Sequence, residues 1–144
     1  MRSPLRIASG QGFWGDDLDA PVRQVEGGPI DVLMMDYLAE VTMSILQKQR
    51  HRDPSLGYAR DVVPLMQRIL PAVVGRGIRV TTNAGGVNPA ACAEAILAVG
   101  RKLGLAGKLK VGIVSGDDIL GRLDELLGRG VALNDMDTGR PLAD

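Results

Sequence analysis

Four short apolar runs, each followed by a loop of small and polar residues, constrain the fold of this chain more than any other feature. The runs are Leu5–Ser9, Asp31–Asp36, Ile78–Asn83 and Leu109–Ser115. Two of them are continuously apolar at their centres, which is typical of parallel strands covered on both faces. Helix-like segments separate the runs. The pattern therefore predicts an α/β fold: a three-layer, Rossmann-like domain with a mainly parallel sheet of about four strands flanked by helices.

The segments between the runs have helical periodicity and recognisable ends. We expect helices at Leu18–Glu26, Ala39–Gln49, Tyr58–Val74, Ala90–Leu103 and Asp118–Leu127. Asp17 and Asn88 are predicted N-caps, and Pro89 suits the first helical position. Pro71 has no backbone N–H, so it is expected to kink or end the third helix.

Size and composition exclude several classes of protein. The chain has 144 residues and a net charge of zero, without the basic stripe of a nucleic-acid-binding protein. No apolar stretch is long enough to span a bilayer, so no membrane partner is expected. One cysteine cannot form an internal disulfide, which favours a cytoplasmic location. We expect one domain over residues 1–130, with 131–144 as a linker or truncated continuation.

Ligands of open parallel sheets bind outside the carboxyl ends of the strands, and the unusual loop residues fall at that edge. The first loop carries Gly10, Gly12 and Gly15 at the spacing of a dinucleotide-binding turn. Asp36, at the end of the next run, stands where a ribose-binding acid would lie. The alternative is a tight glycine turn in which Asp17 caps the helix.

Two features of the same loop argue against NAD or FAD. Phe13 and Trp14 are bulky where the backbone should approach a pyrophosphate. Asp16 and Asp17 place negative charge at a helix N-terminus, where a phosphate would bind. A third interpretation is a site for another ligand, in which Trp14 forms an apolar wall beside acidic groups. The predicted substrate-binding residues of this loop are Gly10, Gly12, Phe13, Trp14 and Gly15.

The third loop is the best candidate for substrate contact. Paired glycines allow close backbone approach, and the neighbouring side chains are neutral donors and acceptors. The predicted substrate-binding residues here are Thr82, Asn83, Gly85, Gly86 and Asn88. The alternative is a strand-to-helix turn, which already accounts for Asn88 as a cap.

Carboxylates are the candidate catalytic groups. Asp36, Asp16 and Asp117 are predicted to act as acid, base or cation ligand. Gly116, in the fourth loop, is a predicted substrate-binding residue. The aspartates of three loops are expected to converge at one edge of the sheet. With a single histidine and a single cysteine, a metal site built from those residues is excluded. The ligands of any metal stay undetermined, and a divalent cation or a CoA thioester substrate are the groups considered.

Three motifs in order resemble one family. They are Gly-Gln-Gly-Phe-Trp-Gly-Asp (10–16), Asp-Tyr-Leu-Ala-Glu-Val-Thr-Met-Ser-Ile-Leu (36–46) and Thr-Asn-Ala-Gly-Gly-Val-Asn-Pro (82–89), followed by Gly-Asp-Asp (116–118). The chain resembles the N-terminal domain of the acyclic terpene utilisation protein A (AtuA-like) family, formerly a domain of unknown function. The resemblance implies catabolism of acyclic terpenes such as citronellol and geraniol through branched acyl-CoA intermediates. Family members continue further, so the chain is expected to be truncated.

These observations lead to one expected function and two alternatives. We expect a catabolic protein that binds or acts on a small branched carboxylated or CoA-linked substrate, by lyase or hydratase chemistry. The first alternative is a non-catalytic nucleotide- or CoA-binding module. The second is an assembly subunit, which would form a homo-oligomer or associate with a missing C-terminal region.

Overall fold

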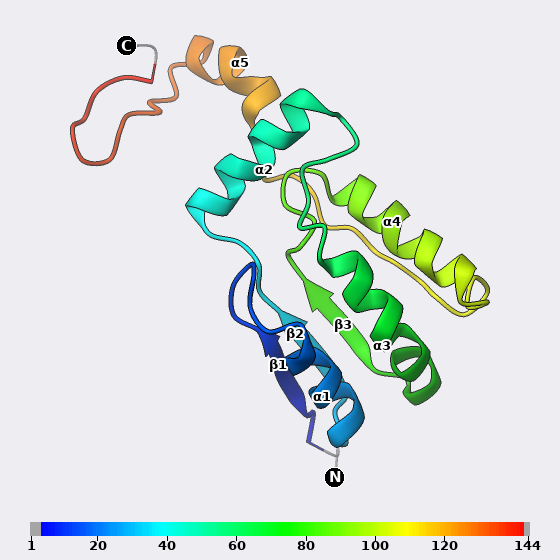
Figure 1. Cartoon of the computed structure of the whole chain (residues 1–144). Coiled ribbons are helices and arrows are strands. Elements are labelled where there is room, and N and C mark those ends of the chain that lie inside the picture. The colour runs from blue at the N-terminus through cyan, green and yellow to red at the C-terminus, as the bar shows by residue number, and fades with distance from the viewer. Residues whose placement is uncertain (1–3, 143–144) are drawn as a thin grey trace. The chain divides into compact units, whose positions relative to one another are not determined.

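The computed structural model describes residues 4–142, which fall into two units that meet between Val114 and Ser115. The first unit contains, in order, β1 (Ile7–Gln11), α1 (Asp19–Gly27), β2 (Val32–Met35), α2 (Glu40–Arg52), α3 (Val62–Arg76), β3 (Arg79–Thr82) and α4 (Pro89–Lys102) (Figure 1). The second unit contains the 3₁₀ helix η1 (Leu120–Arg122) and α5 (Leu123–Gly128).

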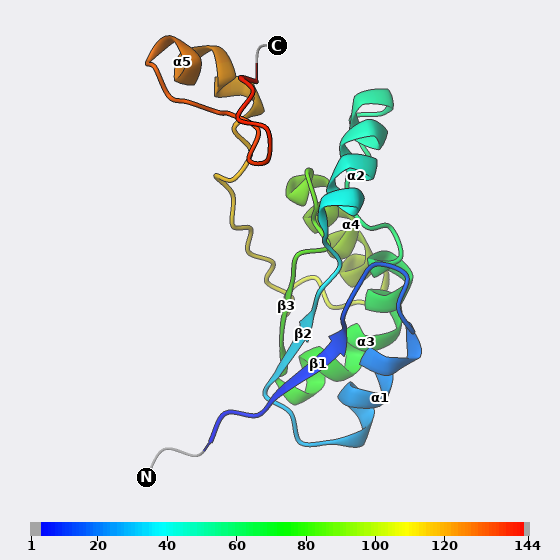
Figure 2. The ribbon, with the colours of Figure 1, turned by 90° about the vertical axis from the view of Figure 1, so that its left-hand side faces the viewer.

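The three strands form a parallel sheet in the order β1-β2-β3. Because the strand order follows the chain in one direction, crossovers of one hand place their helices on the same face. Figure 2 shows α1 and α3 together on one side of the sheet, and α4 packs against α3. Within the first unit the opposite face is uncovered: Ile7 is 64% and Met34 is 38% exposed. The predicted parallel α/β class is confirmed, whereas the three-layer, Rossmann-like arrangement is not.

The prediction of a fourth strand at Leu109–Ser115 is wrong. Leu109 and Val111 pack against the core, but Ile113 is 48% and Val114 is 96% exposed, and the segment pairs with no strand in the described chain. A strand needs a partner that accepts and donates its backbone hydrogen bonds, and an apolar composition alone does not supply one. The sheet therefore has three strands rather than four.

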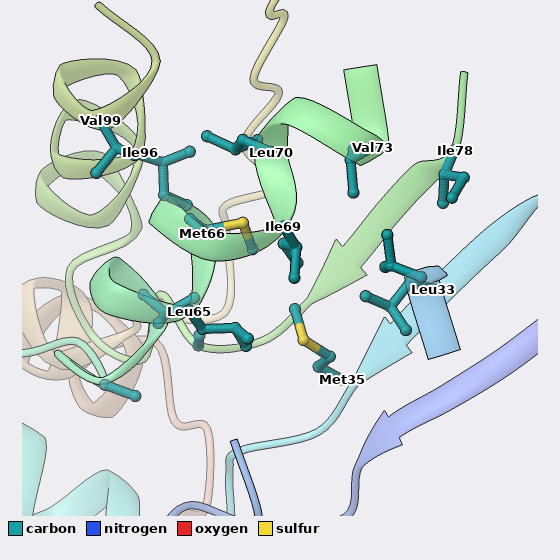
Figure 3. Packing of buried hydrophobic residues seen from close by; sticks show 14 of the residues in the cluster. Leu33, Met35, Leu65, Met66, Ile69, Leu70, Val73, Ile78, Ile96 and Val99 are labelled. Carbon is teal, nitrogen blue, oxygen red and sulfur yellow. The ribbon is translucent and has the colours of Figure 1, made fainter. Parts of the chain in front are cut away.

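The core lies between the sheet and α3. Leu33 and Met35 of β2 face Leu65 and Ile69 of α3, and all four are at most 1% exposed (Figure 3). Gly10 belongs to this packing, because β1 continues through Gly10 and Gln11 instead of ending at Ser9 as predicted. A Cβ at Gly10 would lie 3.0 Å from Leu33 Cδ1 and 3.2 Å from Pro21 Cβ of α1. Glycine thus permits the close approach of α1 to the sheet.

Pro71 lies inside α3 and does not end it, so that part of the prediction is wrong. The helix continues to Arg76 and ends at Gly77, whose φ of +69° is a left-handed C-cap. Leu70 and Val73, on either side of Pro71, are buried in the core, so tertiary packing outweighs the lost backbone hydrogen bond. Pro71 itself is exposed, and water can satisfy the carbonyl that it leaves unpaired.

Local signals locate the other helix ends to within a few residues. Asn88 caps α4 as predicted, because its Oδ1 accepts the Ala91 N–H at 3.3 Å. Asp17 Oδ1 accepts the Asp19 N–H at 2.8 Å, one residue ahead of the assigned N-cap, Leu18. No helix within residues 4–142 is long and apolar enough to cross a membrane.

Candidate functional site

Asp36 and Asn83 meet at the carboxyl edge of the sheet, where β2 and β3 end. Asn83 Nδ2 donates to Asp36 Oδ1 at 2.7 Å, and the Tyr37 N–H donates to Asn83 Oδ1 at 2.7 Å. The Leu38 N–H donates to the same Asp36 oxygen at 3.2 Å. These bonds follow from the parallel pairing of β2 with β3, which aligns Met35 with Thr82.

The hydrogen bonds determine the charge of this pair. The Asn83 amide, followed by the Leu38 N–H, lowers the pKa of Asp36 below its ordinary value. Asp36 is therefore an oriented, ionised carboxylate at neutral pH, beside an exposed amide. Such a pair can accept a proton or a hydrogen bond through the carboxylate and donate a hydrogen bond through the amide.

Internal packing accounts for the conformation of the third loop. A Cβ at Gly85 would lie 2.9 Å from Pro89 Cα, and one at Gly86 would lie 2.7 Å from Gly57 O and would clash with Leu46. Gly86 also has a φ of +52°, which disfavours other residues. Thr82 Oγ1 accepts the Ala84 N–H at 3.1 Å. Contact of these residues with a substrate stays a prediction.

Asn88 links three segments around the same loop. Besides capping α4, its Nδ2 donates to Pro54 O at 2.9 Å and to Leu56 O at 2.8 Å. Both the Nδ2 and the Oδ1 of its amide are thus hydrogen-bonded within the protein. This arrangement supports a structural role for Asn88 at the base of the loop.

In the first loop the backbone amides bind Asp16. The Gly12 N–H donates to Asp16 Oδ2 at 3.0 Å, and the Asp17 N–H donates to Asp16 Oδ1 at 2.7 Å. Gly15 adopts a φ of +96° to close the turn. The side chain of Asp16 thus occupies amides that a pyrophosphate would need. Phe13 is 61% exposed at the tip of the loop.

The two units divide the predicted aspartates. Asp16 and Asp36 belong to the first unit, whereas Gly116 and Asp117 belong to the second, so their convergence stays a prediction. Asp118 Oδ1 accepts the Leu120 N–H at 3.1 Å ahead of η1. Within residues 4–142 no three His, Cys, Asp or Glu side chains are grouped as metal ligands would be.

The sequence did not single out Gln11, Tyr37 and Asp61, which carry buried polar atoms. Gln11 is 2% and Tyr37 is 1% exposed, and burial raises the pKa of the Asp61 carboxyl. Trp14 is partly buried against the hydrophobic core. The only sequence signal was Gln11 itself, a long polar residue between two glycines at the end of an apolar run.

Cys92 is buried as expected for a small apolar residue in α4. It is 4% exposed, and burial raises the pKa of its thiol to about 11. A thiol with so high a pKa is a poor nucleophile at neutral pH.

These features define the class: an α/β protein in which polar loop residues gather at the carboxyl ends of a parallel sheet. The sequence profile of the family described as acyclic terpene utilisation family protein AtuA matches residues 5–144. The chain therefore belongs to this family, as its motifs predicted, and membership suggests a role in acyclic terpene utilisation. No curated protein and no solved structure matched the sequence.

Proposed function

We propose that the protein binds a small branched carboxylated or CoA-linked compound of acyclic terpene catabolism at the carboxyl edge of the sheet. The observation that carries the proposal is the Asp36–Asn83 pair, in which an ionised carboxylate and an exposed amide are fixed side by side. Family membership supports the class of compound. The position at the ends of adjacent parallel strands supports the location.

The pair suits proton transfer next to a thioester carbonyl. One N–H of the Asn83 amide binds Asp36, and the other can donate to a carbonyl oxygen. When Asp36 takes a proton from the adjacent carbon, the electron pair moves to that oxygen, where the amide stabilises the negative charge. This step is common to lyases and hydratases. Phe13 and Trp14, in the loop after β1, supply apolar surface for a branched chain.

The alternative is a nucleotide- or CoA-binding module without chemistry of its own. The glycine spacing of the first loop favours this alternative. The Asp16 carboxylate on the amides of Gly12 and Asp17 opposes it, since a phosphate would have to displace that carboxylate.

Calorimetric titration separates the two functions. The full chain is titrated with a branched acyl-CoA, free CoA, NAD and ATP, and the titrations are repeated with Asn83→Ala and Asp36→Asn. We expect branched acyl-CoA to bind, Asn83→Ala to weaken it about tenfold, and Asp36→Asn to abolish any turnover. Thr81→Ala is the matched control, because Thr81 is exposed one residue before β3 ends. Equal binding of free CoA or ATP by all variants would favour the module, and no binding would refute both.

A further inference from the structure

One face of α2 is exposed from its first turn to its last. Figure 2 shows this helix beyond the carboxyl ends of the strands. On its inner face Leu46 is buried, and Arg50 Nη1 donates to Val87 O at 2.5 Å, so the loop after β3 holds this side of the helix. On its outer face Val41 is 68% and Ile45 is 40% exposed. These two apolar side chains are four residues apart, so they lie on the same face of the helix.

A small residue, Ser44, lies between these two side chains. Ser44 is exposed, and its Oγ donates to Val41 O at 2.9 Å. Because this hydroxyl is paired inside its own helix, another helix can cover Ser44 without leaving a donor unpaired. The small side chain also lets a second helix approach closely at this point.

The charges on the exposed face are separated by sign. Glu40 is exposed at the start of the helix and Lys48 is exposed two turns later. Neither forms an ion pair with any residue from 4 to 142. Each is four residues from Ser44, so the two lie about 6 Å from it along the axis, in opposite directions. Arg52, exposed one turn after Lys48, adds to the positive end of the face.

A face with this arrangement complements a second copy of itself. When two α2 helices pack antiparallel about a twofold axis near Ser44, Val41 and Ile45 of each copy meet the apolar residues of the other. The same axis places Glu40 of each copy beside Lys48 of the other, which makes two equivalent ion pairs. Parallel packing would instead bring like charges together. The antiparallel contact is isologous, so it closes after two copies.

We propose that the exposed face of α2 is the interface of a homodimer, in which the two helices cross antiparallel at Ser44. The apolar part of the face is small, so the dimer is weak, with a dissociation constant in the micromolar range. This inference concerns a surface outside the Asp36–Asn83 pair and does not depend on the proposed function.

Analytical ultracentrifugation of the full chain over a range of concentrations tests the proposal. We expect a reversible equilibrium between monomer and dimer. Ile45→Gln should raise the dissociation constant of the dimer by about tenfold or more, because it removes the central apolar contact. Ile7→Gln is the matched control, since Ile7 is 64% exposed on the uncovered face of the sheet. Circular dichroism checks that both variants keep the helix content of the wild type.

A charge exchange tests the antiparallel geometry. Glu40→Lys and Lys48→Glu should each raise the dissociation constant about tenfold, because each replaces two ion pairs with two like-charge contacts. The double variant reverses both pairs and should restore the wild-type value. Ser44→Cys, next to the axis, should form a disulfide-linked dimer on oxidation, since the native Cys92 is buried. Ser55→Cys, exposed after the end of α2, should not.

Four results would overturn the proposal. The first is a wild type that stays monomeric up to millimolar concentration. The second is a dimer whose dissociation constant is unchanged by Ile45→Gln. The third is a dimer lost in Ile7→Gln, which would place the interface on the sheet. The fourth is a double charge variant that is weaker than either single variant, because the effects of the two substitutions must cancel across an antiparallel contact.

Discussion

Replacing Asn83 with alanine removes the side chain that joins the loops after β2 and β3. Two hydrogen bonds of 2.7 Å are lost. The Tyr37 N–H, on a residue that is 1% exposed, loses its acceptor, and an unpaired buried N–H costs about 1–3 kcal/mol. The bond to Asp36 is exposed, so water replaces it at little cost. We therefore expect Asn83→Ala to lower the free energy of unfolding by about 1–3 kcal/mol, or about 2–4 °C per kcal/mol in Tm.

The same substitution has a pH signature. In the wild type the Asn83 amide lowers the pKa of Asp36 below that of the unfolded chain, about 3.9. The resulting stabilisation is fully present above pH ~3.9 and is lost as the pH falls through the folded pKa. In Asn83→Ala the pKa of Asp36 should move toward its ordinary value. The stability difference from the wild type should therefore shrink in acid, down to the part due to Tyr37.

Urea unfolding at several pH values and an NMR titration of Asp36 test both expectations. Asn83→Asp keeps an acceptor for the Tyr37 N–H but places a second carboxylate beside Asp36, so it should raise the pKa of Asp36. Thr81→Ala is the control and should change neither quantity. If Asn83→Ala has the unfolding midpoint and slope of the wild type, and the pKa of Asp36 does not move, the reasoning is refuted.

Three further predictions concern other parts of the first unit. Gly86→Ala should lower the free energy of unfolding in urea by about 2–4 kcal/mol, because the new Cβ meets both a left-handed φ and a clash. Gly104→Ala, where φ is +69° but the space is open, should lower it by only about 1–2 kcal/mol. Equal losses in the two variants would contradict the clash at Gly86. Leu33→Ala should lower the free energy of unfolding by about 2–5 kcal/mol, and Val114→Ala by less than about 0.5 kcal/mol. A large loss for Val114→Ala would indicate that Leu109–Ser115 is a paired strand after all. Burial raises the pKa of Asp61, so the wild type should lose stability as the pH rises from about 3.9 through the folded pKa. Asp61→Asn should flatten this part of the thermal-stability profile and raise Tm at pH 7, and an unchanged profile would contradict that cause.

Local signals predicted much of the fold and part of the site. The Asn88-Pro89 pair located the start of α4, and the parallel pattern placed Asp36 and Asn83 at one edge, where their side chains meet. Their hydrogen bond also requires β2 and β3 to be neighbours in the sheet, which the structure shows and the sequence did not predict. The helix start and the shared edge therefore follow from short sequence patterns, whereas the contact itself does not.

Long-range packing was beyond the sequence. Gly86 is constrained by Leu46 and Gly57, which come from distant segments, so its loop suggested a ligand site instead. Pro71 continues a helix because buried neighbours hold it in place. The burial of Gln11 and Tyr37 likewise depends on segments that are distant in the chain. The periodicity of the sequence does not predict such long-range contacts.

The chain-order arrangement of β1, β2 and β3 has a consequence for how the sheet assembles. Each strand pairs only with strands that are its neighbours in the chain, so no pairing skips over another strand. β1, α1 and β2 can form a first βαβ unit, onto which α3 and β3 then add. Val25→Ala in α1 should therefore slow refolding, whereas Val99→Ala in α4 should mainly speed unfolding. The opposite result in stopped-flow kinetics would mean that the sheet nucleates around α4.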